Sequence, residues 1–159
     1  MMRRTKRLLG CAVVGLATVA VGACSNSDAS IPPAQAVEKS AAIDSGDSVC
    51  QALAADQATL LAQFKSAHPN PSDSDTRDYL VNTWSPRLER AVGDFHRIGE
   101  PTKDKNGWDL IVADLDNDLA DFKASISTDP AKLLDAKPFN DEAKAFNDYG
   151  FKDCAKSLS

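Results

Sequence analysis

The stretch WDLIVADLDNDLADFKASI, residues 108–126, carries the clearest helical pattern in the chain. Its apolar side chains recur at steps of three and four residues, which places them on one face of an α-helix. These positions are Trp108, Ile111, Val112, Leu115, Leu119, Phe122 and Ile126. Acidic side chains lie between them. We therefore predict an amphipathic helix whose apolar face packs against other helices.

Two further helical segments precede this one. The first is predicted to start at an N-cap at Asp47 or Ser48 and to stop at His68-Pro69. Its repeating positions are Cys50, Leu53, Gln57, Leu60, Leu61 and Phe64. The second runs from about residue 75 to residue 98, with Leu80, Trp84, Leu88, Ala91, Phe95 and Ile98 on one face. Pro86 interrupts it, but the apolar phase continues, which favours one kinked helix over two short ones.

The residues after 126 predict a short turn and a last helix. Asp129-Pro130 is typical of an N-cap followed by proline at the first helical position. Pro138 is expected to open the last helix, in which the inward side chains are Phe139, Ala143 and Phe146. Gly150 fits the left-handed residue that ends a helix, with Phe151 packing back on Phe146 in a Schellman motif.

These segments predict the fold class. No segment alternates with a period of two for long enough to indicate a sheet. Four helical segments with short links predict an all-α protein, a single up-down-up-down four-helix bundle over residues 47–159. In such a bundle the start of the first helix and the end of the last lie at the same end, which would bring Cys50 close to Cys154.

The first 24 residues predict export and lipid anchoring. Basic residues at 3, 4, 6 and 7 precede an apolar run from Leu8 to Val21, as in a signal peptide. Val21-Gly22-Ala23-Cys24 then resembles a bacterial lipobox, whose cysteine is acylated after cleavage. We expect a signal peptide over 1–23, and a lipidated Cys24 with a disordered tether over 24–46. Localisation would be the extracytoplasmic face of the cell membrane.

Composition and charge limit the partners. Removing residues 1–23 would take away four of the 18 Lys and Arg residues and none of the 23 Asp and Glu residues, so the formal net charge would fall from −5 to −9. Such a charge argues against nucleic acid as a partner, because its phosphates would repel the chain. Solubility at a negatively charged envelope is the favoured explanation of this charge, with a basic partner or bound cations as the alternative.

The cysteines predict one disulfide. Cys11 would leave with the signal peptide and Cys24 would be acylated, so Cys50 and Cys154 remain. An exported protein with two remaining cysteines most economically forms one bridge. No Cys-x-x-Cys spacing or Cys/His cluster indicates a zinc or redox site, and we expect no cofactor.

Three acidic groups are candidate cation sites. The densest holds Asp114, Asp116, Asp118 and Asp121, but it lacks the glycine and the final glutamate of an EF-hand loop. The other two are Asp73, Asp75 and Asp78, and Asp104, Asn106 and Asp109. We interpret the first as a solvated helix face and the others as capping and turn residues, with weak cation binding as the alternative.

The sequence selects no catalytic residue. His68 and His96 are predicted near the C-termini of different helices, at opposite ends of the bundle, so they would not share a metal ion. A carboxylate pair for glycoside chemistry remains open, but the pattern does not choose one. We expect the indoles of Trp84 and Trp108 to pack in the core. The alternative is a ligand groove between the second and third helices at Trp84, Pro86 and Trp108, because a proline kink opens space between helices.

The layout resembles small lipoproteins of mycobacteria and related actinobacteria. The residues that carry the resemblance are Val21 to Cys24, Cys50 and the closing Tyr149-Gly150-Phe151-x-x-Cys154-Ala155. The resemblance implies an envelope location and a small helical domain, and it transfers no catalytic residue. We therefore expect a non-enzymatic module that binds an envelope protein or a small ligand. The alternatives are a cell-wall enzyme that uses acidic residues and a module that weakly binds divalent cations.

Overall fold

The computed structural model describes residues 36–134, 136, 139 and 142–158 of the 159-residue chain. Within these residues the chain is helical and no strand forms, apart from an isolated bridge between Val37 and Pro101. The elements are α1 (Lys39–Ala67), α2 (Asp73–Tyr79), the π-helical turn η1 (Leu80–Trp84), α3 (Ser85–Arg97), α4 (Lys105–Ser125), α5 (Pro130–Leu134), α6 (Ala143–Tyr149) and α7 (Lys152–Leu158). The predicted all-α class is confirmed.

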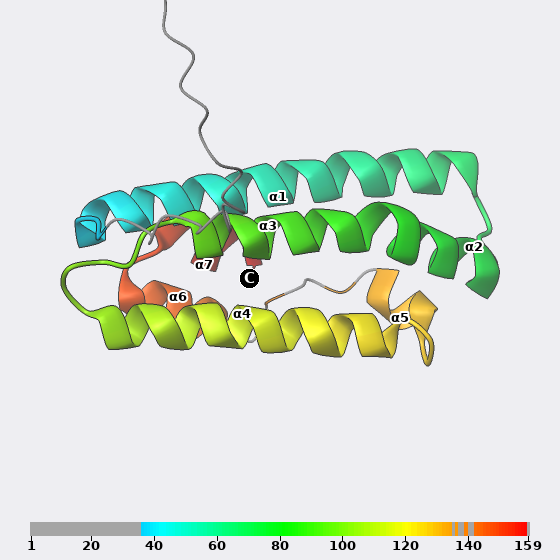
Figure 1. The fold of residues 1–159 in the computed structure, drawn as a ribbon. Coiled ribbons are helices and arrows are strands. Elements are labelled where there is room, and N and C mark those ends of the chain that lie inside the picture. Colours follow the sequence, from blue (N-terminus) through cyan, green and yellow to red (C-terminus); the bar gives the residue numbers. More distant parts are fainter. Residues whose placement is uncertain (1–35, 135, 137–138, 140–141, 159) are drawn as a thin grey trace, which may run out of the picture. The chain divides into compact units, whose positions relative to one another are not determined.

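Three long helical segments lie side by side, as Figure 1 shows: α1, the continuous segment from α2 through η1 to α3, and α4. α3 packs on both α1 and α4, while α7 packs on α1 and α6 packs on α4 and α7. The predicted four-helix up-down order is not confirmed. The described parts of residues 130–158 form three short helices where the sequence predicts a turn and one long helix.

α1 begins eight residues before the predicted N-cap. Residues 39–46, which their composition assigns to the tether, are helical, and Ala42 and Gly46 are buried. A Cβ atom on Gly46 would lie 2.3 Å from Cε1 of Phe151, so the absent side chain is what lets α1 approach the C-terminal helices. Tertiary packing thus overrides a sequence with weak helical preference. The expected tether before residue 36 lies outside the described residues.

Asp47 caps a different helix from the one predicted. Its carboxylate accepts hydrogen bonds from the backbone N–H groups of Lys152 at 3.2 Å, Asp153 at 3.0 Å and Cys154 at 3.0 Å. It therefore holds the first turn of α7 from 105 residues away in sequence. A carboxylate at this position satisfies free N–H donors and meets the positive end of the helix dipole.

A disulfide lies beside this cap. Cys50 of α1 and Cys154 of α7 are bonded, with their Cα atoms 5.0 Å apart and 104 residues between them in sequence. Both cysteines are buried, and the pairing is the one that the sequence predicts. We call this part of the domain the disulfide end, and it comprises the N-terminal half of α1 with α6 and α7.

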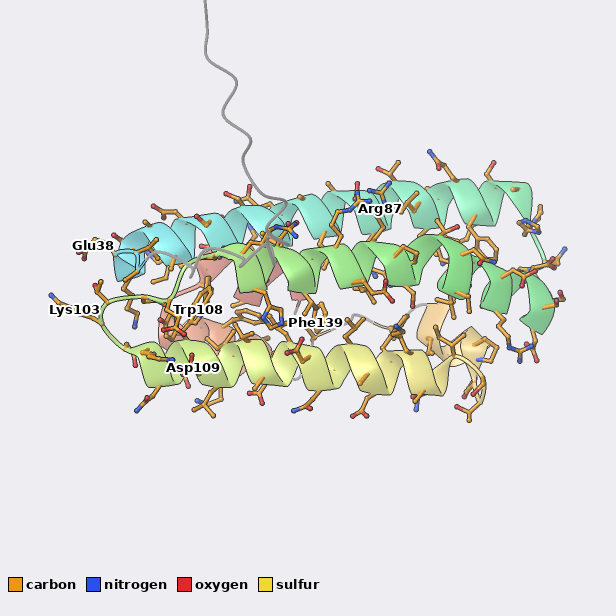
Figure 2. All side chains as sticks on the ribbon, in the orientation of Figure 1. Glu38, Arg87, Lys103, Trp108, Asp109 and Phe139 are labelled. Carbon is orange, nitrogen blue, oxygen red and sulfur yellow. A yellow bond between two sulfur atoms is a disulfide. The ribbon has the colours of Figure 1, made fainter. Side chains whose placement is uncertain are left out.

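Aromatic side chains fill the core next to the disulfide. The rings in mutual contact are Phe95, Trp108, Phe146, Tyr149 and Phe151, with centroids 5.4–6.2 Å apart. Figure 2 shows the labelled Trp108 and Phe139 in the space between α3 and α4. Phe146 and Phe151 are among the most completely buried side chains of the described residues. The largest part of the apolar core therefore supports the disulfide end.

The end of α6 has the predicted geometry, but its start does not. Gly150 has a φ of 120°, and the N–H of Phe151 donates to the carbonyl of Phe146 at 2.9 Å, as a Schellman motif requires. The helix begins at Ala143, however, because Phe139 has a left-handed φ of 62°. Phe139 is buried as predicted, while Pro138 lies outside the described residues.

Pro86 is accommodated in one continuous helix. Proline has no N–H, and its ring clashes with the carbonyl four residues earlier in an α-helix. The turn just before it, η1, is π-helical, with the N–H of Ser85 bonded to the carbonyl of Leu80. The wider turn lets the helix continue, so the prediction of one helix rather than two is confirmed, with a π-helical turn as its irregularity.

Candidate functional site

An open groove lies between the C-terminal part of α1 and the α2–η1 segment, with a volume of about 510 Å³. Figure 1 shows the loop that joins α1 and α2, and the lining residues of the groove come from the helical turns on both sides of that loop. We call it the distal groove. The residues that line it are Leu60, Gln63, Phe64, Ala67, His68, Asp75, Asp78, Tyr79, Asn82 and Thr83.

The two walls of the groove have the same helical spacing. Positions 60, 63, 64, 67 and 68 form one face of α1, and positions 75, 78, 79, 82 and 83 form one face of α2 and η1. Asn82 and Thr83 belong to the π-helical turn. Because π-helical turns within α-helices often occur at functional sites, η1 is a candidate part of a functional site.

Three stacked rings form part of the groove. The Phe64 ring lies between those of His68 and Tyr79, with centroid distances of 5.1 Å and 4.5 Å and interplanar angles of 26° and 24°. Phe64 is buried, while the His68 side chain is 43% exposed. Stacked rings of this kind give a rigid apolar surface with polar groups at its edge.

The Tyr79 hydroxyl is the least expected polar group of the site. The residue is 9% exposed, and its hydroxyl has no hydrogen-bond partner in the part of the chain that the structure describes. Burial raises the pKa of the Tyr79 phenol, so it remains protonated at neutral pH. A nearly buried phenol that borders an open groove is available to a ligand as donor or acceptor.

Two carboxylates stand on the same wall but in different states. Asp75 forms a capping box with Ser72, whose hydroxyl and backbone N–H donate to it at 2.7 Å and 2.9 Å. These bonds lower the pKa of the Asp75 carboxyl, and His68 Nδ1 lies 3.8 Å away. Asp78 is exposed and has no partner among the described residues. The Asp75 carboxylate is therefore used to cap α2, whereas the Asp78 carboxylate is available to a ligand.

Trp84 and Trp108 pack in the core, as expected, and the alternative of a groove at Trp84, Pro86 and Trp108 is not found among the described residues. Both indoles are 3% exposed and belong to the core, which leaves neither of them open to a ligand. Pro86 lies at the surface of the first turn of α3. The open groove instead lies one turn earlier on the second helical segment, and α1 rather than α4 forms its other wall.

The acidic groups form no metal site in the described residues. No three His, Cys, Asp or Glu side chains converge there as ligands would. Asp116 of the densest group pairs with Nε2 of His96 at 3.0 Å, Asp109 pairs with Lys105, and Asp104 pairs with Lys39. No aspartate or glutamate is buried among the described residues.

The histidines lie where the sequence predicts. His68 follows the last residue of α1, and its N–H donates to the carbonyl of Phe64. His96 lies in the last turn of α3. The two are thus at C-terminal ends of different helices, but His68 has a role that the sequence analysis missed, because it lines the distal groove.

Sequence reasoning also missed Gln63, Tyr79, Asn82 and Thr83 as site residues. A usable signal was present: polar and aromatic residues repeat with matching spacing on both sides of the His68-Pro69 stop. Two antiparallel helices joined by a short loop must bring such faces together. The spacing does not show, however, whether the facing side chains fill the space between the two helices or leave a groove there.

The signal peptide and Cys24 lie outside the described residues. Within the part of the chain that the structure describes, no helix is both long enough and apolar enough to cross a bilayer. Comparison of the chain with protein-family models, with curated proteins and with solved structures finds no match.

Proposed function

We propose that this chain is an exported lipoprotein of the cell envelope, anchored to the membrane at Cys24, and that its helical domain is a non-enzymatic binding module. The basic start, the apolar run and the Val21-to-Cys24 motif support export and acylation. The resemblance to small actinobacterial lipoproteins supports the same location. The binding surface in this proposal is the distal groove.

One observation carries the binding role: the groove holds polar groups that the fold does not use. The Tyr79 hydroxyl and the Asp78 carboxylate have no partner among the described residues. No buried side-chain polar atom of the described residues lacks a partner, so both groups are open to solvent, and a ligand can replace the water that they bind. The cavity volume of about 510 Å³ falls in the range of small-molecule sites.

The position of the groove fits an anchored protein. Val37 is held by the loop after α3, since its N–H donates to Glu100 at 3.0 Å and its carbonyl accepts from Thr102 at 2.8 Å. The chain therefore enters the domain at the opposite end of α1 from the groove. α1 has 29 residues and spans about 44 Å. The groove therefore lies at the end of α1 farther from Val37, near which the chain joins the domain.

We do not propose the two alternatives. Glycoside hydrolysis needs a pair of carboxyl groups, one of them with a raised pKa, whereas the pKa of Asp75 in the groove is lowered. Binding of Ca²⁺ needs six or more oxygen ligands that converge on one point. No such convergence occurs among the described residues.

The anchor is tested by labelling cells with an alkyne fatty acid and separating membrane from soluble material. The full chain is expected to carry the label in the membrane fraction, and Cys24→Ala is expected to lose both. Cys11→Ala is the matched control, because Cys11 lies inside the expected signal peptide. Label that persists in Cys24→Ala would contradict the proposal.

The groove is tested by photo-crosslinking on intact cells. A photoreactive residue replaces Asn82, which lines the groove, or Asn117, which is exposed on α4. We expect a defined adduct from position 82 and none from position 117, identified by mass spectrometry. Equal adducts at both positions, or none at position 82, would remove the groove from the proposal.

A further inference from the structure

We infer that the distal groove binds an alkylammonium group, carried either by a free amine or by a lysine-type side chain of a peptide. This inference rests on the proposed function, because it takes the groove as the binding surface and adds the chemistry of the ligand. Its argument starts from the charges and the unused acceptors of the groove.

The charge of the groove selects a cation. Its lining residues include Asp75 and Asp78 but no lysine or arginine, and the one histidine, His68, has its Nδ1 3.8 Å from Asp75. An anionic ligand would therefore leave water without gaining a permanently charged cationic partner, which is costly. The whole chain has a formal net charge of −5, so its field attracts cations over a longer range.

Tyr79 gives a second observation that does not depend on the acidic residues. Its ring is nearly buried and lines the groove, and its hydroxyl has no hydrogen-bond partner within the described part of the chain. No buried side-chain polar atom of the described residues lacks a partner, so this hydroxyl is open to solvent and a ligand can reach it. An ammonium group has three N–H donors and no acceptor. The Asp78 carboxylate, the Tyr79 oxygen and the side-chain carbonyl of Asn82 are three acceptors on one helical face. The set matches the donors of an ammonium in number and kind.

The other wall suits the carbon chain of such a ligand. Leu60, Phe64 and Ala67 line the α1 side and have no charged group. Lysine-type stems bury their methylene groups along apolar surfaces while the charged head stays with polar partners. A small metal cation would make no use of this wall. The combination of the two walls thus favours an organic cation over an inorganic one.

The experiment titrates the full-length chain, purified in a neutral detergent, with three probes of equal carbon number. The probes are 1,5-diaminopentane, pentan-1-ol and pentanoate, and the readout is the backbone amide shifts of the groove residues in NMR spectra. We expect saturable shifts with the diamine alone. A capped tripeptide with a central lysine distinguishes the source: tighter binding of the peptide indicates a peptide side chain, and tighter binding of the diamine indicates a free amine.

Two conservative variants test the named groups. Asp78→Asn removes the charge and keeps the shape, and we expect it to weaken diamine binding about tenfold, as loss of a charged hydrogen-bond partner does. Tyr79→Phe keeps the ring stack and removes the hydroxyl, with an expected loss of about threefold. Asp44→Asn is the matched control, because Asp44 is exposed on α1 outside the groove and its carboxylate has no recorded partner in the described chain.

The outcomes separate this inference from the proposed function. If pentan-1-ol binds as tightly as the diamine, or if Asp44→Asn and Asp78→Asn weaken binding equally, the alkylammonium inference is overturned. The same holds if no amine causes saturable shifts. The crosslinks at position 82 test the groove itself, so a defined adduct there without amine binding would refute the ligand class and leave the proposed function standing.

Discussion

The disulfide end and the distal groove lie on different halves of α1 and are held by different means. At the disulfide end, a covalent bridge, the Asp47 cap and a cluster of five aromatic side chains fix α7 against α1. At the groove, the Phe64 ring of α1 stacks on the Tyr79 ring of α2, and Nδ1 of His68, the residue after α1, lies 3.8 Å from Asp75. The first end is tied by contacts far apart in sequence, and the second by neighbours across one loop.

This difference separates stability from binding. A covalent bridge between residues 104 positions apart persists in the unfolded chain and restricts it strongly, so the disulfide end should contribute most to the free energy of unfolding. The groove keeps polar groups without internal partners, which contribute little to folding and remain available to a ligand. Substitutions at the disulfide end should therefore lower stability, whereas substitutions in the groove should mainly change binding.

Removing the disulfide is the strongest test of this contrast. Cys50→Ser combined with Cys154→Ser opens a loop of 104 residues, which should lower the free energy of unfolding by about 4 kcal/mol. Urea unfolding measures the loss, and native-state hydrogen exchange locates it. Exchange should rise most in α7 and in the first half of α1. A loss that is confined to the groove helices would contradict the contrast.

The close approach at Gly46 gives the next largest effect. Gly46→Ala would place a Cβ atom 2.3 Å from Phe151 and 3.0 Å from Phe95, and we expect a loss of about 3 kcal/mol from overpacking. The matched control is Gly93→Ala, whose Cβ would meet only Nη1 of Arg97, at 3.7 Å. That variant should gain about 0.5 kcal/mol, because alanine favours the helix. Thermal unfolding of both variants decides the matter, and equal effects would refute the account.

Asp47 tests the cap of α7. Asp47→Ala leaves three backbone N–H groups without their acceptor and should cost about 2 kcal/mol in urea unfolding. Asp44→Ala removes the same charge one turn earlier on α1. The Asp44 carboxylate has no hydrogen-bond or ion-pair partner among the described residues, so this variant should change stability little. A similar loss in both variants would mean that net charge, rather than the cap, causes the effect.

The sequence allowed prediction of what depends on local spacing. The stripe from Trp108 to Ile126 predicts α4, and Gly150 predicts the end of α6, because both follow from residues within a few turns. The start of α1 was not predictable in this way, since Gly46 and Asp47 are helical on account of Phe151 and α7, about 105 residues away. Those contacts appear only once the chain has folded.

The same distinction explains the candidate site. The disulfide pair was predictable by counting cysteines, but the groove was not, because Tyr79 and Trp84 are both large aromatic residues on the same helical segment and the sequence does not show which of them borders a groove. A π-helical turn lies between them, and its wider geometry shifts the side chains that follow it relative to those of a regular α-helix. Pro86 hints at an irregularity, but its position alone does not give the type of turn.

The smallest expected effect concerns the capping box next to the groove. Ser72→Ala removes the side chain that accepts from the Asp75 N–H and donates to its carboxylate, at an expected cost of about 1 kcal/mol near pH 7. Ser74→Ala, exposed in the same turn, is the control and should change little.

The dependence of this cost on pH identifies the part due to Asp75. The bonds from Ser72 lower the pKa of the Asp75 carboxyl in the folded state, so their contribution is fully present above the unfolded pKa of about 3.9 and is lost as the pH falls through the folded value. The difference in stability between wild type and Ser72→Ala should therefore shrink between pH 5 and pH 2 in urea unfolding. It should not vanish, because the bond from the Asp75 N–H to the Ser72 hydroxyl does not titrate. A difference that stays constant over this range would show that the cap acts through the backbone alone.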